Sequence, residues 1–204
     1  MTDPIELVRT GCDRIAAAYL RRNEEDLGPA TRFMPTLRDT LPAGARVLDL
    51  GCSAGVRTRL LEDRFRLVGV DLSAEQLRLA HARLPGPMLL QADMTRLSFR
   101  PGSFDAVVAL YSLIHVPREH HADVLRGIST WLRPGGRFLA CLGSGDDPSS
   151  IELDWLGVPM FWSGFDAATN ERMLAEAGLE TQIAELVTDG DETFLWVLAS
   201  KRSD

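Results

Sequence analysis

Lysine is almost absent from this chain. Lys201, in the C-terminal tail, is the only lysine, and every other cationic side chain apart from the histidines is an arginine. A phosphate-binding loop of the P-loop type needs a lysine beside its phosphates, and Schiff-base catalysis needs a lysine amine in the site. We therefore expect neither activity. Because arginine codons are rich in G and C, the same bias points to a GC-rich bacterial source.

Cysteine and long apolar runs are also scarce. Cys12, Cys52 and Cys141 have no zinc-ligand spacing, so we expect reduced thiols, as in cytoplasmic proteins. No run approaches the roughly 20 apolar residues that a membrane helix needs. The first residues lack the basic and then apolar blocks of a signal peptide. These absences predict a cytoplasmic protein with no membrane partner.

Basic residues are outnumbered by acids, which gives a formal net charge of −7. Nucleic-acid binding requires a concentrated basic surface, so no nucleic-acid partner is expected. The chain has 204 residues, of which 45% are hydrophobic. That is enough for one substantial core, so residues 1–204 are predicted to form a single domain.

Apolar runs and helical periodicities alternate along most of the chain. Strands are expected at 45–50, 66–70, 87–91, 104–110 and 136–142, and helices at 4–22, 31–40, 55–64, 73–83 and 118–132. The run Ala106–Leu110 has no polar alternation, which is typical of a strand buried on both faces of a parallel sheet. Two further strands, 180–187 and 193–200, flank a turn at 189–192. The prediction is an α/β fold of the Rossmann-like, doubly wound type, with a mostly parallel seven-stranded sheet that ends in an antiparallel β-hairpin. It comprises an N-terminal helical cap at 1–40, a core at 45–200 and a substrate lid at 143–165, which is expected to be a loop that begins with the flexible stretch 143–148.

A glycine turn follows the first predicted strand, in Asp49-Leu50-Gly51-Cys52-Ser53-Ala54-Gly55. Ligands of open α/β sheets bind beyond the carboxyl ends of the strands, where such a turn exposes backbone N–H groups. A dinucleotide fingerprint needs glycines at i, i+2 and i+5, and two of these positions are Ser53 and Val56. The spacing i, i+2, i+4 fails only at Ser53.

The segment Val47–Gly55 resembles the first motif of class I S-adenosylmethionine (SAM)-dependent methyltransferases, with Ser53 in place of the central glycine. Four later segments are similar to the family's motifs and occur in the family's order; they are 69–73, 91–94, 104–108 and 132–138. With the terminal hairpin, the resemblance covers roughly residues 40–200 of the printed sequence. It implies SAM as cofactor and S-adenosylhomocysteine (SAH) as product.

The resemblance also implies a set of cofactor-binding residues. Asp49 is expected to hold the glycine turn and approach the methionine end of SAM, Asp71 to accept both ribose hydroxyls, and Asp93 to reach the adenine amino group. The complete set is Tyr19, Asp49, Gly51, Ser53, Gly55, Asp71, Leu72, Asp93, Met94, Leu110 and Tyr111. Asp71 and Asp93 also have simpler readings, as a helix N-cap and as a turn residue.

His115 follows the fourth predicted strand and is the candidate general base, because its pKa class suits neutral pH. The alternative is that it only packs against the cofactor. His120 and His121 are expected on an exposed helix face, and no metal site is predicted. The aromatic residues Trp155, Phe161 and Trp162 are expected to contact the acceptor or to form a packed plug.

Four functions remain open from the sequence. The first is a methyltransferase acting on an O, N or C atom of a small-molecule acceptor. The acidic balance, and the absence of a Pro-Pro-aromatic motif after the fourth strand, oppose the second, an RNA methyltransferase. The glycine spacing opposes the third, a NAD-dependent oxidoreductase. The fourth is a non-catalytic SAM-binding protein, which Ser53 makes conceivable.

Overall fold

The computed structural model describes residues 3–203, which form one seven-stranded sheet with helices on both faces and a separate two-stranded sheet. The helices are α1 (Pro4–Glu25), α2 (Ala30–Asp39), α3 (Arg59–Glu62), α4 (Ala74–Arg83), α5 (His121–Trp131) and α6 (Ala167–Glu176). The strands are β1 (Arg46–Leu50), β2 (Arg66–Asp71), β3 (Met88–Gln91), β4 (Phe104–Leu110), β5 (Leu132–Gly143), β6 (Asp147–Trp155), β7 (Val158–Gly164), β8 (Leu179–Asp189) and β9 (Glu192–Lys201). Short 3-10 turns lie at Met94–Arg96, Leu113–His115 and Arg118–His120.

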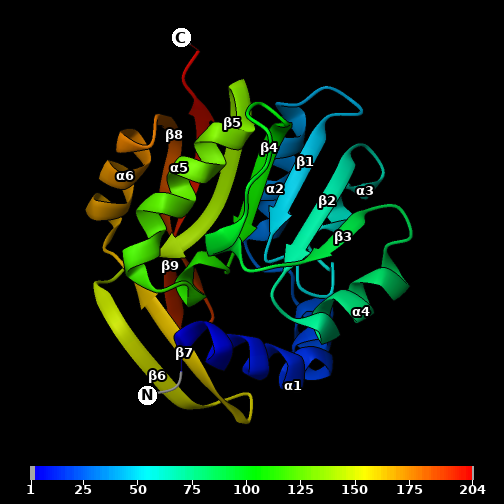
Figure 1. Ribbon diagram of the computed structural model, residues 1–204, viewed down its shortest axis with the longest axis vertical. Helices are drawn as coiled ribbons and strands as arrows, with labels where there is room; N and C mark the ends of the chain where they lie inside the picture. The colour runs from blue at the N-terminus through cyan, green and yellow to red at the C-terminus, as the bar shows by residue number, and fades with distance from the viewer. Residues whose placement is uncertain (1–2, 204) are drawn as a thin grey trace.

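The large sheet has the strand order β3-β2-β1-β4-β5-β9-β8 (Figure 1). The strands from β3 to β5 pair in parallel, whereas β9 is antiparallel to both β5 and β8. The predicted fold class, with its antiparallel terminal hairpin, is therefore confirmed. The chain order reverses between β1 and β4, and a crevice forms at such a switch point beyond the carboxyl ends of the strands.

Each face of the sheet has its own apolar core. On one face, α5 and α6 bury residues such as Leu125, Ile128 and Leu174 against the sheet. On the other face, α2 and α3 bury Phe33 and Leu61. The continuous apolar stretch 106–110 in β4 is buried throughout because it supplies side chains to both cores.

A third, smaller cluster joins α1 to β7 below the carboxyl ends of the strands (Figure 1). Val8 and Ile15 of α1 pack against Val158, Met160 and Phe161 of β7. A Cβ at Gly11 would overlap the end of the Met160 side chain, so helix and strand approach closely. Helix α1 and the β6–β7 hairpin together cover the crevice at the carboxyl ends of the strands.

Three sequence-based expectations need correction. Residues 147–164 form the β6–β7 hairpin and not a flexible loop, because their backbone groups pair across the two strands. Regular helix after the glycine turn is limited to Arg59–Glu62, since residues 51–58 form successive turns. His121 is buried and its Nε2 bonds to the Val116 carbonyl over 2.8 Å, so it is not on an exposed face.

No helix within residues 3–203 is both long and apolar enough to cross a bilayer.

Candidate cofactor and acceptor site

Two adjoining cavities lie at the switch point of the sheet. The inner cavity, between the ends of β1, β2 and β4 and the helix α1, is lined by all of the predicted cofactor-binding residues except Gly55. The outer cavity, of about 910 Å³, lies between α1, the β6–β7 hairpin and the β8–β9 turn. The residues that line both are Tyr19, Asn23, Arg57, Tyr111, His115 and Trp155.

The glycine turn fits closely against the segment that follows β4. Gly51 has φ of +78°, and a Cβ there would overlap the Cβ of Ser112. Only glycine satisfies both the conformation and the space. Ser112 lines the inner cavity, and its buried hydroxyl has no hydrogen-bond partner in the described part of the chain. A polar ligand group could supply that partner.

Ser53 adopts a conformation that normally favours glycine, with φ of +51°. Its backbone N–H donates to Asp71 Oδ2 over 2.9 Å, and its Oγ is 2.9 Å from Oε1 of Gln76. These two bonds offset the conformational cost, so the turn keeps its shape without the central glycine. Ser53 still lines the inner cavity.

Asp71 keeps acceptor capacity that the protein does not use. Its Oδ1 accepts from the Ser73 N–H over 2.9 Å and its Oδ2 from the Ser53 N–H. Each carboxylate oxygen has a second lone pair, so two ligand hydroxyls can also be accepted. The Ser73 hydroxyl accepts from the Gln76 N–H and therefore caps α4, which leaves Asp71 for a ligand. Burial raises the pKa of Asp71 to about 6.

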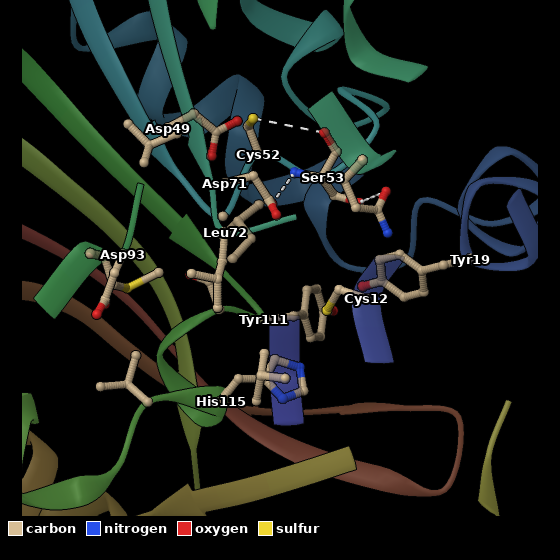
Figure 2. Close-up of a pocket in the computed structure, with 18 of the residues that line it drawn as sticks. Cys12, Tyr19, Asp49, Cys52, Ser53, Asp71, Leu72, Asp93, Tyr111 and His115 are labelled. Atoms are coloured by element: carbon tan, nitrogen blue, oxygen red, sulfur yellow. Dashed lines mark hydrogen bonds between the residues drawn. The ribbon is translucent and has the colours of Figure 1, made fainter. Parts of the chain in front are cut away.

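Asp49 and Asp93 line the same cavity from either side of Asp71 (Figure 2). Asp49 Oδ2 accepts from the Thr58 hydroxyl over 2.5 Å, and burial raises the pKa of Asp49 to about 6. Asp93 Oδ1 accepts from the N–H and hydroxyl of Thr95 and so closes a local turn. Both roles are compatible with binding through the remaining carboxylate oxygen. A ligand that pairs with three carboxylates must offer hydrogen-bond donors, such as hydroxyl, amino or cationic groups.

His115 lies where the cavities meet, and its neighbours fix the state of its ring. Its Nδ1 lies 2.9 Å from the Phe161 carbonyl, which can only accept, so Nδ1 carries the hydrogen and Nε2 is free to accept a proton. The ring packs against Trp162, with centroids 4.5 Å apart, and Trp162 lies against Trp155 at 5.3 Å. Burial lowers the pKa of His115 to about 4, so the imidazole is neutral at pH 7 and is a weaker base than the sequence analysis expected from an ordinary histidine pKa.

The predicted site residues fall into two groups. Trp155 lines both cavities and Trp162 lines the outer one, and their contact with an acceptor stays a prediction. Gly55 and Phe161 line neither cavity. Gly55 sits against Leu84 beyond α4, where a Cβ would overlap that side chain, and Phe161 is buried beneath α1. Phe161 reaches the site only through its carbonyl.

Among the lining residues that escaped the sequence analysis are Asn23, Gln76 and Arg57. Asn23 is a buried polar residue near the end of α1, and Gln76 lies in the first turn of α4. Arg57 follows the glycine turn among many other arginines. None belongs to a recognisable motif, and only the folded chain brings them together.

Known proteins match both the sequence and the fold. Residues 47–136 match the family model described as a methyltransferase domain. The chain is 33% identical over 192 residues to the 27-O-demethylrifamycin SV methyltransferase of Amycolatopsis mediterranei, covering 84% of this chain and 68% of that one. It is 39% identical over 124 residues to the trans-aconitate 2-methyltransferase of Methylobacterium nodulans, and the match covers 59% of this chain and 46% of that relative. It thus spans about half the length of that second relative.

Among solved structures, magnesium protoporphyrin IX methyltransferase from Synechocystis PCC 6803 with bound SAM superposes with a TM-score of 0.77. The match covers 98% of both chains at 16% identity, so it is evidence for the fold alone. A doubly wound sheet with a glycine turn and successive carboxylates at its switch point defines a nucleoside-cofactor protein. With the relatives above, the assignment is specific. The chain belongs to the class I SAM-dependent methyltransferases, as its motifs predicted.

Proposed function

We propose that this protein binds SAM in the inner cavity and transfers its methyl group to a small-molecule acceptor in the outer cavity. The observation that carries the proposal is the junction of the two cavities at His115 and Tyr111. Methyl transfer requires donor and acceptor atoms to meet in line in a confined space, and such positioning accounts for much of the barrier reduction. The volume of the outer cavity suits a ligand of drug-like size.

The residues of the inner cavity match the chemistry of SAM. Asp71 has the acceptor positions for the two ribose hydroxyls, and Asp93 keeps an oxygen for the adenine amino group. Asp49 lies where its negative charge stabilises the cationic methionine end. When bound, SAM supplies the activated methyl group itself. The protein has to orient the acceptor and exclude water.

His115 is the group proposed to receive the acceptor's proton. Its Nδ1–H is held by the Phe161 carbonyl, so Nε2 keeps the lone pair that can accept a proton. As the acceptor's oxygen, nitrogen or carbon forms its new bond to the methyl carbon, the acceptor's proton passes to Nε2. An acceptor that is already ionised, such as a carboxylate, needs no such transfer.

The proposed acceptor class is a small molecule, and the net charge of −7 disfavours RNA. The relatives carry names that specify trans-aconitate and 27-O-demethylrifamycin SV, which provide a carboxylate and a hydroxyl acceptor for the first assays. The proposed location is the cytoplasm, as the reduced cysteines suggest.

The test begins with titration calorimetry of SAM, SAH and NAD. Binding of both sulfur nucleosides without binding of NAD supports the cofactor assignment, and binding of NAD alone contradicts it. Release of SAH in the presence of an acceptor panel then measures turnover. A protein that binds SAM but releases no SAH with any acceptor of the panel is the non-catalytic alternative.

A further inference from the structure

Arg57 carries a positive charge that has no anionic partner within residues 3–203. Its side chain is half-buried, and its Nε is buried without a hydrogen-bond partner. None of the ion pairs among those residues includes it. A guanidinium has five N–H donors, and leaving them unpaired inside a protein is costly. The arrangement calls for an acceptor from outside the chain.

The acids that lie near Arg57 are engaged by other groups. The positive charge of Arg57 partly opposes the rise in the pKa of Asp49, so the two side chains interact electrostatically. Asp49 nevertheless accepts a hydrogen bond from the hydroxyl of Thr58 and forms no ion pair with Arg57. Asp189, the last residue of β8, accepts a hydrogen bond from the Tyr111 hydroxyl over 2.5 Å. Both carboxylates therefore have hydroxyl partners, and neither forms an ion pair with Arg57 in the described part of the chain.

The guanidinium of Arg57 lies over the ring of Tyr111. Arg57 Cζ lies 4.7 Å from the centroid of the Tyr111 ring, within the range of a cation–π contact. That ring is fixed by the bond to Asp189 and by edge contacts with Phe194 and Trp196 at 5.1 and 5.8 Å. Tyr111 also keeps a φ of +53°, which an L residue rarely adopts without support. Arg57 is therefore oriented before any ligand binds.

The position of Arg57 decides what it can bind. It lines both cavities, and among the described residues around the inner cavity it is the only arginine or lysine, whereas Asp49, Asp71 and Asp93 are acids. We propose that Arg57 is the carboxylate-binding residue of the site, at the junction of the inner and outer cavities. A planar guanidinium matches a carboxylate through two parallel hydrogen bonds.

This inference rests on the proposed function, and two carboxylates fit it. One belongs to the amino-acid end of SAM, which is the only anionic group of that cofactor. The other belongs to an anionic acceptor that enters from the outer cavity. Both present the same chemistry to Arg57, and a comparison of ligands separates them.

The first experiment compares SAH with 5′-methylthioadenosine, which has the adenosyl group but no amino-acid carboxylate. Calorimetry is done on the wild type, Arg57→Gln, Arg57→Lys and the control Arg59→Gln, which removes an exposed charge on α3. If the carboxylate is that of the cofactor, Arg57→Gln weakens SAH about 10- to 100-fold and leaves 5′-methylthioadenosine unchanged. Arg57→Lys is expected to recover part of the lost SAH affinity, because lysine keeps the positive charge but cannot make two parallel hydrogen bonds to a carboxylate.

The second experiment titrates citrate and benzoate into the SAH complex. One outcome assigns the carboxylate to the acceptor. In that outcome all variants bind SAH equally, and the SAH complexes of the wild type and Arg59→Gln bind citrate and benzoate. The SAH complex of Arg57→Gln does not bind these two anions. Equal losses for SAH and 5′-methylthioadenosine reduce Arg57 to a support of the cavity and overturn the proposal. The proposal is also overturned if Arg57→Gln and the wild type differ neither in the first experiment nor in the second.

Failure of the proposed function gives a different pattern. If the wild type binds neither SAH nor 5′-methylthioadenosine, SAM binding is refuted. The citrate and benzoate titrations on the ligand-free protein then still test Arg57, since the outer cavity is open to them. Circular dichroism and melting curves of each variant separate a lost contact from a lost fold.

Discussion

The backbone N–H of Ser53 donates a 2.9 Å hydrogen bond to Oδ2 of Asp71. This bond ties the turn after β1 to the carboxylate after β2, so the two main parts of the cofactor site are held together before a ligand binds (Figure 2). Preorganisation of this kind lowers the entropy cost of binding. It also means that Asp71 serves the fold of the turn as well as the ligand.

Asp71→Ala is expected to weaken SAM binding by about 2–4 kcal/mol, because charge-assisted bonds to the ribose are lost. Asp71→Asn should lose less, since its amide oxygen still accepts a hydrogen bond. Calorimetry with SAH measures both variants. Asp63→Ala, which removes an exposed acid paired with Arg38, is the control. Unchanged affinity in Asp71→Ala would remove the ribose assignment.

The pH dependence should differ between affinity and stability. The pKa values of Asp49 and Asp71 are raised by burial to about 6, above their ordinary value of 3.8. At these two groups the folded, ligand-free protein therefore binds more protons than the unfolded chain between these pH values. The contribution of the two carboxylates to the unfolding free energy should fall as pH rises from about 4 to 6, by at most about 3 kcal/mol per carboxylate. Burial lowers the pKa of His115 to about 4, so the contribution of His115 rises over the same interval, and the carboxylate contribution is obtained by comparing variants.

Affinity for SAM should instead rise over the same interval, because the ionised carboxylates are the forms that accept ribose hydroxyls and stabilise the cationic methionine end. Urea titrations and calorimetry between pH 4.5 and 7.5 measure the two quantities. In Asp71→Asn the affinity should depend less on pH. If the unfolding free energy of Asp71→Asn varies with pH between 4.5 and 6 in the same way as that of the wild type, the raised pKa of Asp71 is contradicted.

Gly51→Ala and Gly44→Ala form a matched pair, since both glycines have φ of +78°. A Cβ at Gly44 meets nothing within 4 Å, whereas one at Gly51 overlaps Ser112. Gly44→Ala should therefore cost only the conformational strain of about 1–2 kcal/mol. Gly51→Ala should cost more than this and also impair SAH binding. Urea denaturation gives the first comparison and calorimetry the second; equal costs would argue against a tight turn.

His115→Ala is expected to lower kcat at least about 100-fold with an acceptor that must lose a proton, because the general base is removed. Affinity for SAH should remain near the wild-type value. With an acceptor that is already a carboxylate, the loss should be much smaller. Equal losses with both acceptor types would assign His115 to packing, next to Trp162. Trp162→Phe serves as the control for that packing.

Local sequence predicted much of the cofactor half of the molecule. The apolar runs define β1 to β5 because strands buried on both faces need uninterrupted hydrophobic residues. The turn at Gly51 and the acids at Asp71 and Asp93 follow strand ends, and parallel strands bring their carboxyl ends to one edge. The positions of these groups are therefore set by spacing along the chain.

The acceptor half depended on contacts that spacing does not encode. His115 and Phe161 are 46 residues apart, and Tyr111 and Asp189 are 78 apart, yet each pair is joined by a hydrogen bond. The segment 147–164 was expected to be a loop, and it became a hairpin by pairing its two strands beneath α1.

The sequence by itself therefore determined the sheet, the glycine turn and the family, because periodicity and short motifs are properties of neighbouring residues. The tertiary structure alone decided which nitrogen of His115 is free, why Arg57 stays unpaired and how the outer cavity is walled. Each of these depends on side chains from distant segments that compete for the same hydrogen bonds, and that competition is resolved only when the chain has folded.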